Sequence, residues 1–193
     1  MVPSNRGARP VSRRTPRADA VRNRARVLDA AHAAFTADGP DVSLDEIARR
    51  AGVGAGTVHR HFPTRAALVD AVLAASVTQL VERAQGLAGA DDAVAALFEF
   101  LHELVASGAA AHDLADRLRP SAGDLDTALR EPVAALDHVL AELLERGQLA
   151  GGVRTDVDAA DLSAVVAAAH AAYLHHSGGP PAVRLVLDGL RLR

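Results

Sequence analysis

The sequence predicts an all-α protein, with a three-helix helix-turn-helix domain at the N-terminus followed by a larger helical domain. Apolar residues recur at the 3.6-residue spacing of a helix in most segments, and no alternating strand pattern of useful length interrupts them. Residues 51–68, AGVGAGTVHRHFPTRAAL, also place three glycines and a proline inside otherwise helical sequence. A tight turn between two short helices requires such residues, so this stretch predicts a helix-turn-helix.

The first elements follow from changes in composition. Residues 1–17 are rich in Pro and Arg and show no periodicity, so we expect a mobile arm. A helix is expected from about residue 18 to Asp38, where Gly39 and Pro40 end it. Its apolar stripe comprises Val21, Leu28, Ala31 and Phe35.

Two short helices and a long one come next. Ser43 to Glu46, SLDE, matches a capping box, in which the serine and glutamate side chains each cap the other residue's amide. The helix beginning there is expected to end at Gly52, which tolerates the left-handed conformation of a helix C-terminus. A second helix is expected over 55–61, with Val58 and Phe62 facing the core. Pro63 stops it, and Thr64 caps a longer helix over 65–85.

The remaining helices are predicted from apolar stripes around 94–105 and 133–144, and from the segments 161–174 and 182–192. A glycine- and proline-rich break at 177–181 separates the last two. We therefore expect an arm at 1–17, a helix-turn-helix domain at 18–64 and a larger helical domain at 65–193.

Composition excludes several classes of function. The 193 residues include no cysteine, which excludes disulfides, thiolate metal sites and cysteine nucleophiles. Aromatic residues make up 3%, too few for a broad platform that stacks single-stranded bases. The most apolar run, 162–174, is too short to cross a bilayer. With an Arg- and Pro-rich start in place of a leader pattern, we expect a soluble cytoplasmic protein.

The net charge of −3 is unevenly distributed. Residues 1–70 carry 12 arginines against seven acidic residues, whereas residues 71–193 carry nine arginines against 17. The chain contains no lysine. This asymmetry indicates an anionic partner for the N-terminal part alone, or a solvated Arg-rich tail on an ordinary domain.

A stretch of thirty residues resembles the signature of the TetR family of transcriptional repressors. It covers residues 43–72, SLDEIARRAGVGAGTVHRHFPTRAALVDAV. The preceding AAFTADG fits the same family, and residues 147–166 resemble more weakly the segment that leads into its dimerisation helices. The resemblance implies a homodimeric repressor that binds a palindromic double-stranded DNA operator and is released by a small-molecule effector. No cofactor is implied.

The resemblance also implies roles for single residues. Positions facing base edges in the family are here Ala55, Gly56, Arg60 and His61, and positions contacting phosphates are Ser43, Thr57, His59 and Arg65. The family usually has tyrosine at the position of His59. Arg60 is the best candidate for bidentate recognition of guanine. The bare glycine surface at Gly54 and Gly56 would let the start of this helix approach a phosphate closely, where its dipole favours negative charge.

The arginines of the arm have two possible roles. They could enter a minor groove, or they could add salt-dependent affinity through phosphates, which we favour. The candidates are Arg6, Arg9, Arg13, Arg14 and Arg17.

For the acidic remainder, the resemblance implies an effector pocket and dimerisation through the last two helices. Apolar positions with scattered polar groups provide the pocket candidates, for each of which core packing is the alternative: Phe98, Leu101, His102, Leu118, Leu136, Leu140, His170 and Tyr173. Two stripes predict contact with a second subunit, or else packing within one subunit: Leu162, Val165, Val166, Ala169 and Tyr173, and Val183, Val186, Leu187 and Leu190.

We expect neither a metal site nor catalysis. The six histidines beyond residue 100 form no convincing i, i+4 ligand pair, and no serine nucleophile elbow or phosphate-binding loop is present. Two alternatives to a ligand-released repressor remain. One is a regulator or activator without a ligand; the other is an all-α enzyme that uses interior histidines such as His102 or His170.

Overall fold

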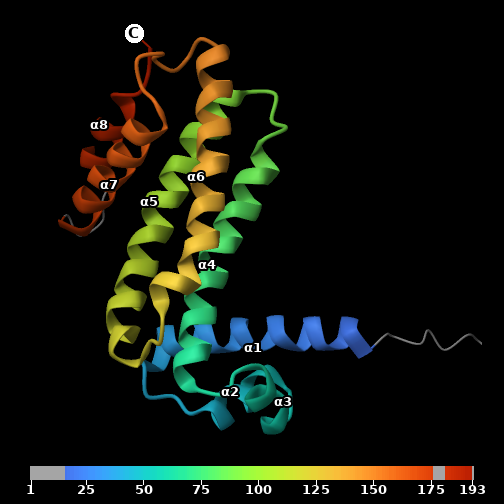
Figure 1. The fold of residues 1–193 in the computed structure, drawn as a ribbon. Helices are drawn as coiled ribbons and strands as arrows, with labels where there is room; N and C mark the ends of the chain where they lie inside the picture. Colours follow the sequence, from blue (N-terminus) through green and yellow to red (C-terminus); the bar gives the residue numbers. More distant parts are fainter. Residues whose placement is uncertain (1–15, 176–180, 193) are drawn as a thin grey trace, which may run out of the picture.

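A computed structural model describes residues 16–175 and 181–192, and all the regular elements in these residues are helices (Figure 1). The predicted all-α class is confirmed. Most of the predicted arm and most of the predicted break at 177–181 lie outside the described residues. In chain order the elements are α1 (Pro16–Asp38), α2 (Leu44–Ala51), α3 (Ala55–His61), α4 (Arg65–Leu87), α5 (Ala93–Leu118), the short 3-10 helix η1 (Arg119–Ser121), α6 (Leu125–Leu149), α7 (Ala159–His175) and α8 (Pro181–Asp188).

The helices form two groups that share α4 and α5. The long helices α4, α5 and α6 run side by side, and α1 lies across their lower end (Figure 1). Helices α2 and α3 lie below α1 at the lower edge of the molecule. At the opposite end, α7 and α8 pack on each other and on α5. The helix-turn-helix therefore lies far from the last two helices.

The first core lies beneath the helix-turn-helix. It takes buried side chains from α1, α2 and α3, from the first turns of α4, and from the C-terminal end of α5. Its largest fully buried members include Phe35, Ile47 and Leu68, which are 0% exposed. Because α4 and α5 both contribute, this core joins the predicted helix-turn-helix segment to the helices that follow.

The second core fills the space among α4, α5, α6, α7 and α8. Buried members of both stripes considered for dimer contact belong to this core: Leu162, Ala169, Val183, Leu187 and Leu190. The other members of those stripes, Val165, Val166, Tyr173 and Val186, pack against it partly buried. The stripes thus stabilise the subunit itself, which is the alternative that the sequence left open.

Two expectations about individual elements are wrong. Val21 belongs to the predicted apolar stripe of α1 but is 66% exposed, because the first turns of α1 extend beyond the rest of the molecule (Figure 1). The last helix was expected to continue to residue 192 but ends at Asp188. Beyond it the chain is held by backbone hydrogen bonds, from Arg154 N to Leu190 O at 3.0 Å and from Leu192 N to Gly152 O at 3.1 Å. These two bonds replace the continuation of the helix.

Two helical glycines provide a test of packing in the second core. A Cβ added at Gly147 of α6 would lie 2.9 Å from Val153 Cγ2 and 3.3 Å from Leu97 Cδ2, whereas one at Gly86 of α4 would meet nothing within 4 Å. We expect Gly147→Ala to lower the free energy of unfolding by about 1–3 kcal/mol, the usual cost of overpacking. Gly86→Ala should raise it by up to about 1 kcal/mol, because alanine favours a helix. Urea unfolding followed by circular dichroism measures both, and equal effects would contradict the packing at Gly147.

Candidate nucleic-acid interface

The first helix of the motif, α2, begins at a serine cap. The Ser43 hydroxyl accepts a hydrogen bond from the Glu46 amide at 3.2 Å, as the sequence predicts. The reciprocal half of the predicted capping box is wrong. Both carboxylate oxygens of Glu46 instead accept hydrogen bonds from Arg49 and Arg50, one turn further along the helix, at 2.6–2.7 Å. Charged guanidinium donors attract a carboxylate more strongly than a neutral amide does.

The turn is fixed by a left-handed glycine. Gly52 has φ 62° and ψ 38°, and its amide donates to Arg49 O at 3.2 Å. The next amide, of Val53, donates to Ala48 O at 3.0 Å, and its side chain packs half-buried against the first core. A residue other than glycine rarely adopts this φ, so the expected role of Gly52 follows directly from its conformation.

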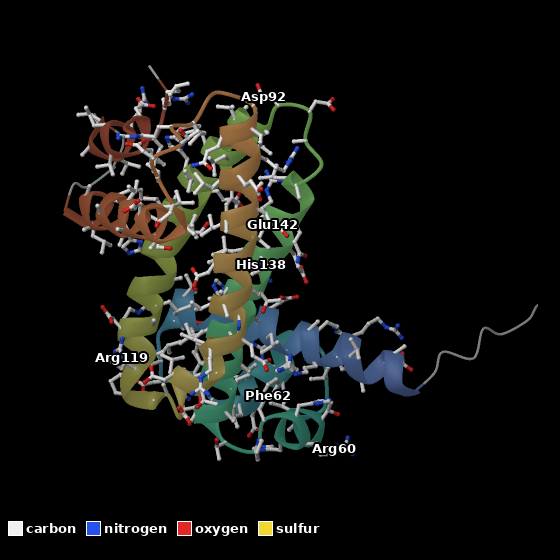
Figure 2. The ribbon with its side chains drawn as sticks, turned by 45° about the horizontal axis from the view of Figure 1, so that its top comes forward. Arg60, Phe62, Asp92, Arg119, His138 and Glu142 are labelled. Atoms are coloured by element: carbon white, nitrogen blue, oxygen red, sulfur yellow. The ribbon has the colours of Figure 1, made fainter. Side chains whose placement is uncertain are left out.

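Helix α3 has one buried and one exposed face. Val58 is 0% exposed, and Phe62, just after the helix, is 2% exposed, so both lie in the first core. Arg60 lies at the lower edge of the molecule and Phe62 lies inside (Figure 2). The predicted contact residues occupy the other face: Ala55, Gly56, His59 and Arg60 are exposed, and Thr57 and His61 are half-buried.

The exposed face of α3 begins with two glycines, Gly54 and Gly56, which have no side chains. A Cβ added at Gly54 or Gly56 would meet no atom within 4 Å, so internal packing does not require either glycine. Gly54 is the N-cap of α3 and provides no side-chain cap. At the other end of the face, Arg60 Nη2 donates to Thr57 Oγ1 at 3.3 Å, which brings two predicted contact residues together.

Arg65 differs from the other predicted contact residues. Its Nη1 donates to Val42 O at 2.6 Å, and its guanidinium lies over the Phe35 ring with Cζ 5.6 Å from the centroid. Its Nη2 is buried with no hydrogen-bond partner. The side chain therefore ties the start of α4 to the α1–α2 connection.

Sequence reasoning missed two arginines that α1 places beside the motif. Arg24 Cζ lies 5.5 Å from the centroid of the Phe62 ring, and Arg26 Nη2 lies 3.4 Å from Gly52 O. Both side chains are exposed. Only the crossing of α1 over α3 brings them here, so no local pattern could have identified them.

The cations of α2 are largely neutralised by acids. Arg50 bridges Glu46 and Asp38, with Nη1 2.6 Å from Asp38 Oδ2, while Arg49 pairs with Glu46. Hydrogen bonds from Arg49 and then Arg50 lower the pKa of Glu46 from 4.5 to about 2. The spacing of Arg at i+3 and i+4 from Glu is the sequence signal that could have predicted this cluster.

Three of the eight predicted pocket residues come together, and the other five lie elsewhere. Leu136, Leu140 and His170 line an open hollow of about 350 Å³ between α5, α6 and α7. Phe98 and Leu101 are buried in the second core and Leu118 in the first. His102 is exposed, with Nδ1 2.7 Å from Phe98 O, and Tyr173 is half-buried against the second core.

The described residues contain neither a cluster of metal-binding side chains nor a single helix that could span a membrane. They contain no group of three or more His, Asp or Glu side chains that could hold a metal ion. None of their helices alone is long and apolar enough to cross a membrane. Helices α3 and α4 reach that length only together, with a bend of 75° between them.

Family models and solved structures match this chain along most of its length. Residues 27–72 match bacterial regulatory proteins of the tetR family, and residues 92–192 match the C-terminal domain of SbtR-like transcriptional regulators. A TetR transcription regulatory protein from Mycobacterium vanbaalenii is 46% identical, with a TM-score of 0.75, over 92% of this chain and 100% of that one. This chain belongs to the TetR family. It is a DNA-binding transcriptional regulator with an N-terminal helix-turn-helix, and the family is not one of enzymes.

Other TetR-family relatives differ in how much they match. The TetR transcriptional regulator SCO0520 from Streptomyces coelicolor is 31% identical over 87% of this chain and 98% of that one, with a TM-score of 0.69. The HTH-type transcriptional regulator TtgW of Pseudomonas putida, itself described as uncharacterized, is 48% identical over 58 residues. That match spans 30% of this chain and 43% of TtgW, so this chain spans less than half the length of that relative.

The Glu46 cluster gives a pH prediction. The pKa of Glu46 is lower in the folded protein, so its contribution is fully present above pH 4.5 and is lost as the pH falls through about 2. We expect Glu46→Gln to lower the unfolding temperature at pH 7 and the difference from wild type to shrink between pH 4.5 and 2. Thermal unfolding at pH values from 7 to 2 measures this difference in unfolding temperature. Glu82→Gln, on the exposed face of α4, is the control. A difference that is independent of pH would contradict the assignment.

Proposed function

We propose that this TetR-family regulator is a repressor that binds an approximately palindromic operator as a homodimer in the cytoplasm and is released by a small effector. The observation that carries the proposal is the two-sided character of α3. One side is anchored by Val58 and Phe62, and the other leaves Arg60 exposed at the edge of the molecule (Figure 2). A helix held in this way can enter a major groove without loss of its core contacts.

In this proposal the predicted contact residues have different roles, which follow from their chemistry. Arg60 reads guanine, Ala55 and Gly56 offer methyl and backbone contacts, and His61 lies at the end of the same face. Ser43, Thr57 and His59 hold phosphates. Arg65 contributes through the fold by its hydrogen bond to Val42 O. The division into residues 18–64 for DNA binding and 65–193 for ligand binding and dimerisation is part of the proposal.

Dimerisation is supported by apolar surface on the last two helices. Leu185 of α8 is 76% exposed and Leu174 of α7 is 48% exposed, although both helices contribute other residues to the second core. Ala160, Ala164, Ala168 and Ala171 of α7 are exposed as well. Small residues allow helices of two subunits to approach closely. A two-fold dimer would place its recognition helices in successive major grooves, roughly 34–36 Å apart.

A selection of binding sites from random duplex DNA tests the operator and Arg60 together. We expect the full-length protein to enrich an inverted repeat. On that duplex, Arg60→Ala should weaken the binding free energy by about 1–3 kcal/mol. It should also relax the base preference at one base pair in each half-site. Arg119→Ala, on a surface away from α3 (Figure 2), is the charge-matched control and should change little. An enriched site without two-fold symmetry, or an undiminished affinity of Arg60→Ala, would overturn the proposal.

A second prediction concerns the dimer. A carboxylate buried without a partner at an interface is costly, so we expect Leu185→Glu to raise the monomer–dimer Kd about tenfold or more. Leu149→Glu is the control because Leu149 is also an exposed leucine, at 82%, but lies at the end of α6. Sedimentation equilibrium measures both constants. If the two variants dimerise equally well, α8 is not at the interface.

A further inference from the structure

A cavity of about 420 Å³ lies between α1, α4 and α5 and contains none of the pocket residues expected from the sequence. It is the larger of two hollows that share His32, Ser76 and Gln79, the smaller being about 220 Å³. Together they follow the crossing of α1 and α4. Cavities of several hundred cubic ångströms with a few polar groups are typical of small-molecule sites.

The lining of the larger cavity contains both polar and apolar side chains, and its acidic and basic groups balance in charge. Glu103 and Arg117, both from α5, are its acidic and basic members, and Glu103 already accepts a hydrogen bond from Arg83 Nε at 3.1 Å. The neutral polar groups are hydroxyls, one amide and one imidazole, from Thr36, Ser76, Ser107, Gln79 and His32, and the other lining side chains are aliphatic. A buried ionic ligand would need an excess of opposite charge, which this lining does not provide. A neutral ligand fits it better.

Arg117 connects the cavity to the helix-turn-helix. Its Nη2 donates to Phe35 O at 2.6 Å, and the Gly39 amide donates to the same oxygen at 3.1 Å. Phe35 is in the last turns of α1, and its ring is fully buried in the first core beneath the guanidinium of Arg65. The hydrogen bond from Arg117 therefore fixes the end of α1 from which the chain passes to α2.

We infer that this cavity binds the effector, a neutral molecule with an apolar body and a carbonyl or ether oxygen. Occupancy acts through Arg117: the ligand oxygen competes with Phe35 O for its Nη2, and the C-terminal turn of α1 loosens. A ligand can shift the conformation only by its different affinity for the two forms, and this hydrogen bond differs between them. That the ligand regulates DNA binding rests on the proposed function; the site and its link to α1 do not.

The site is tested with Nile red, a neutral dye that has a carbonyl oxygen and becomes fluorescent in apolar surroundings. We expect saturable binding to the full-length protein. Ala111→Trp, which fills the cavity from α5, should weaken it tenfold or more, while Ala106→Trp on the exposed face of α5 should not. Thr36→Trp, with Ala37→Trp as its control, repeats the test from α1 in case Ala111→Trp fails to fold. Absence of saturable binding, or equal binding by each pair, overturns the inference.

The link to α1 is tested by hydrogen exchange of residues 36–43, without DNA. The dye should speed exchange of this segment in the wild type. Arg117→Met should speed it without dye and abolish the further increase, whereas Arg119→Met should behave as wild type. A dye response that survives in Arg117→Met overturns the role of Arg117. If both dye experiments succeed but operator affinity does not fall when dye is added, the site stands and release by effector fails.

Discussion

The structure depends on anchoring a helix that is too short to be stable alone. Helix α3 has seven residues, well below the length at which an isolated helix persists in water, so tertiary contacts must hold it. Val58 and Phe62 bury one side in the first core, and the left-handed Gly52 sets the angle at which α3 leaves α2. The opposite side is thereby left exposed. Rigidity and accessibility of the same helix come from one set of contacts.

The first core also explains how distant helices can affect α3. It includes side chains from the beginning of α4 and the end of α5, so the helix-turn-helix shares a hydrophobic core with the helices that follow it. Two arginines reinforce this junction from different directions. Arg65 reaches back from α4 to Val42 O, and Arg117 reaches from α5 to Phe35 O. A displacement of α4 or α5 must therefore alter contacts at the end of α1.

Charge is used differently on the two helices of the motif. On α2, Glu46 and Asp38 hold Arg49 and Arg50 in ion pairs, which keep that helix close to neutral. On α3 the described contact of Arg60 is a hydrogen bond to the hydroxyl of Thr57. The positive charge suited to DNA thus lies on the exposed face of α3 rather than evenly over the motif. The basic total of residues 1–70 concealed this division.

The sequence by itself determined the elements whose causes are local. The serine cap at Ser43, the glycine at Gly52 and the stop at Pro63 act within a few residues, and α2 and α3 lie where these signals place them. Burial of Val58 and Phe62 also followed from helical spacing. The family signature extended this reading to DNA binding, because its residues are contiguous.

Tertiary structure decided whatever depends on which helices meet. The stripes of α7 and α8 suited a second subunit or the same one, and only the packing on α5 showed that the subunit's own core takes them. Leu118 looked like a pocket residue but is buried beneath the helix-turn-helix. The Glu46 carboxylate could accept from the Ser43 amide or from the guanidinium groups of Arg49 and Arg50, and in the structure it accepts from both guanidinium groups. The cavity of Arg117 has walls from three helices separated in the chain, and a pattern along one helix carries no information about the neighbours that complete such a cavity.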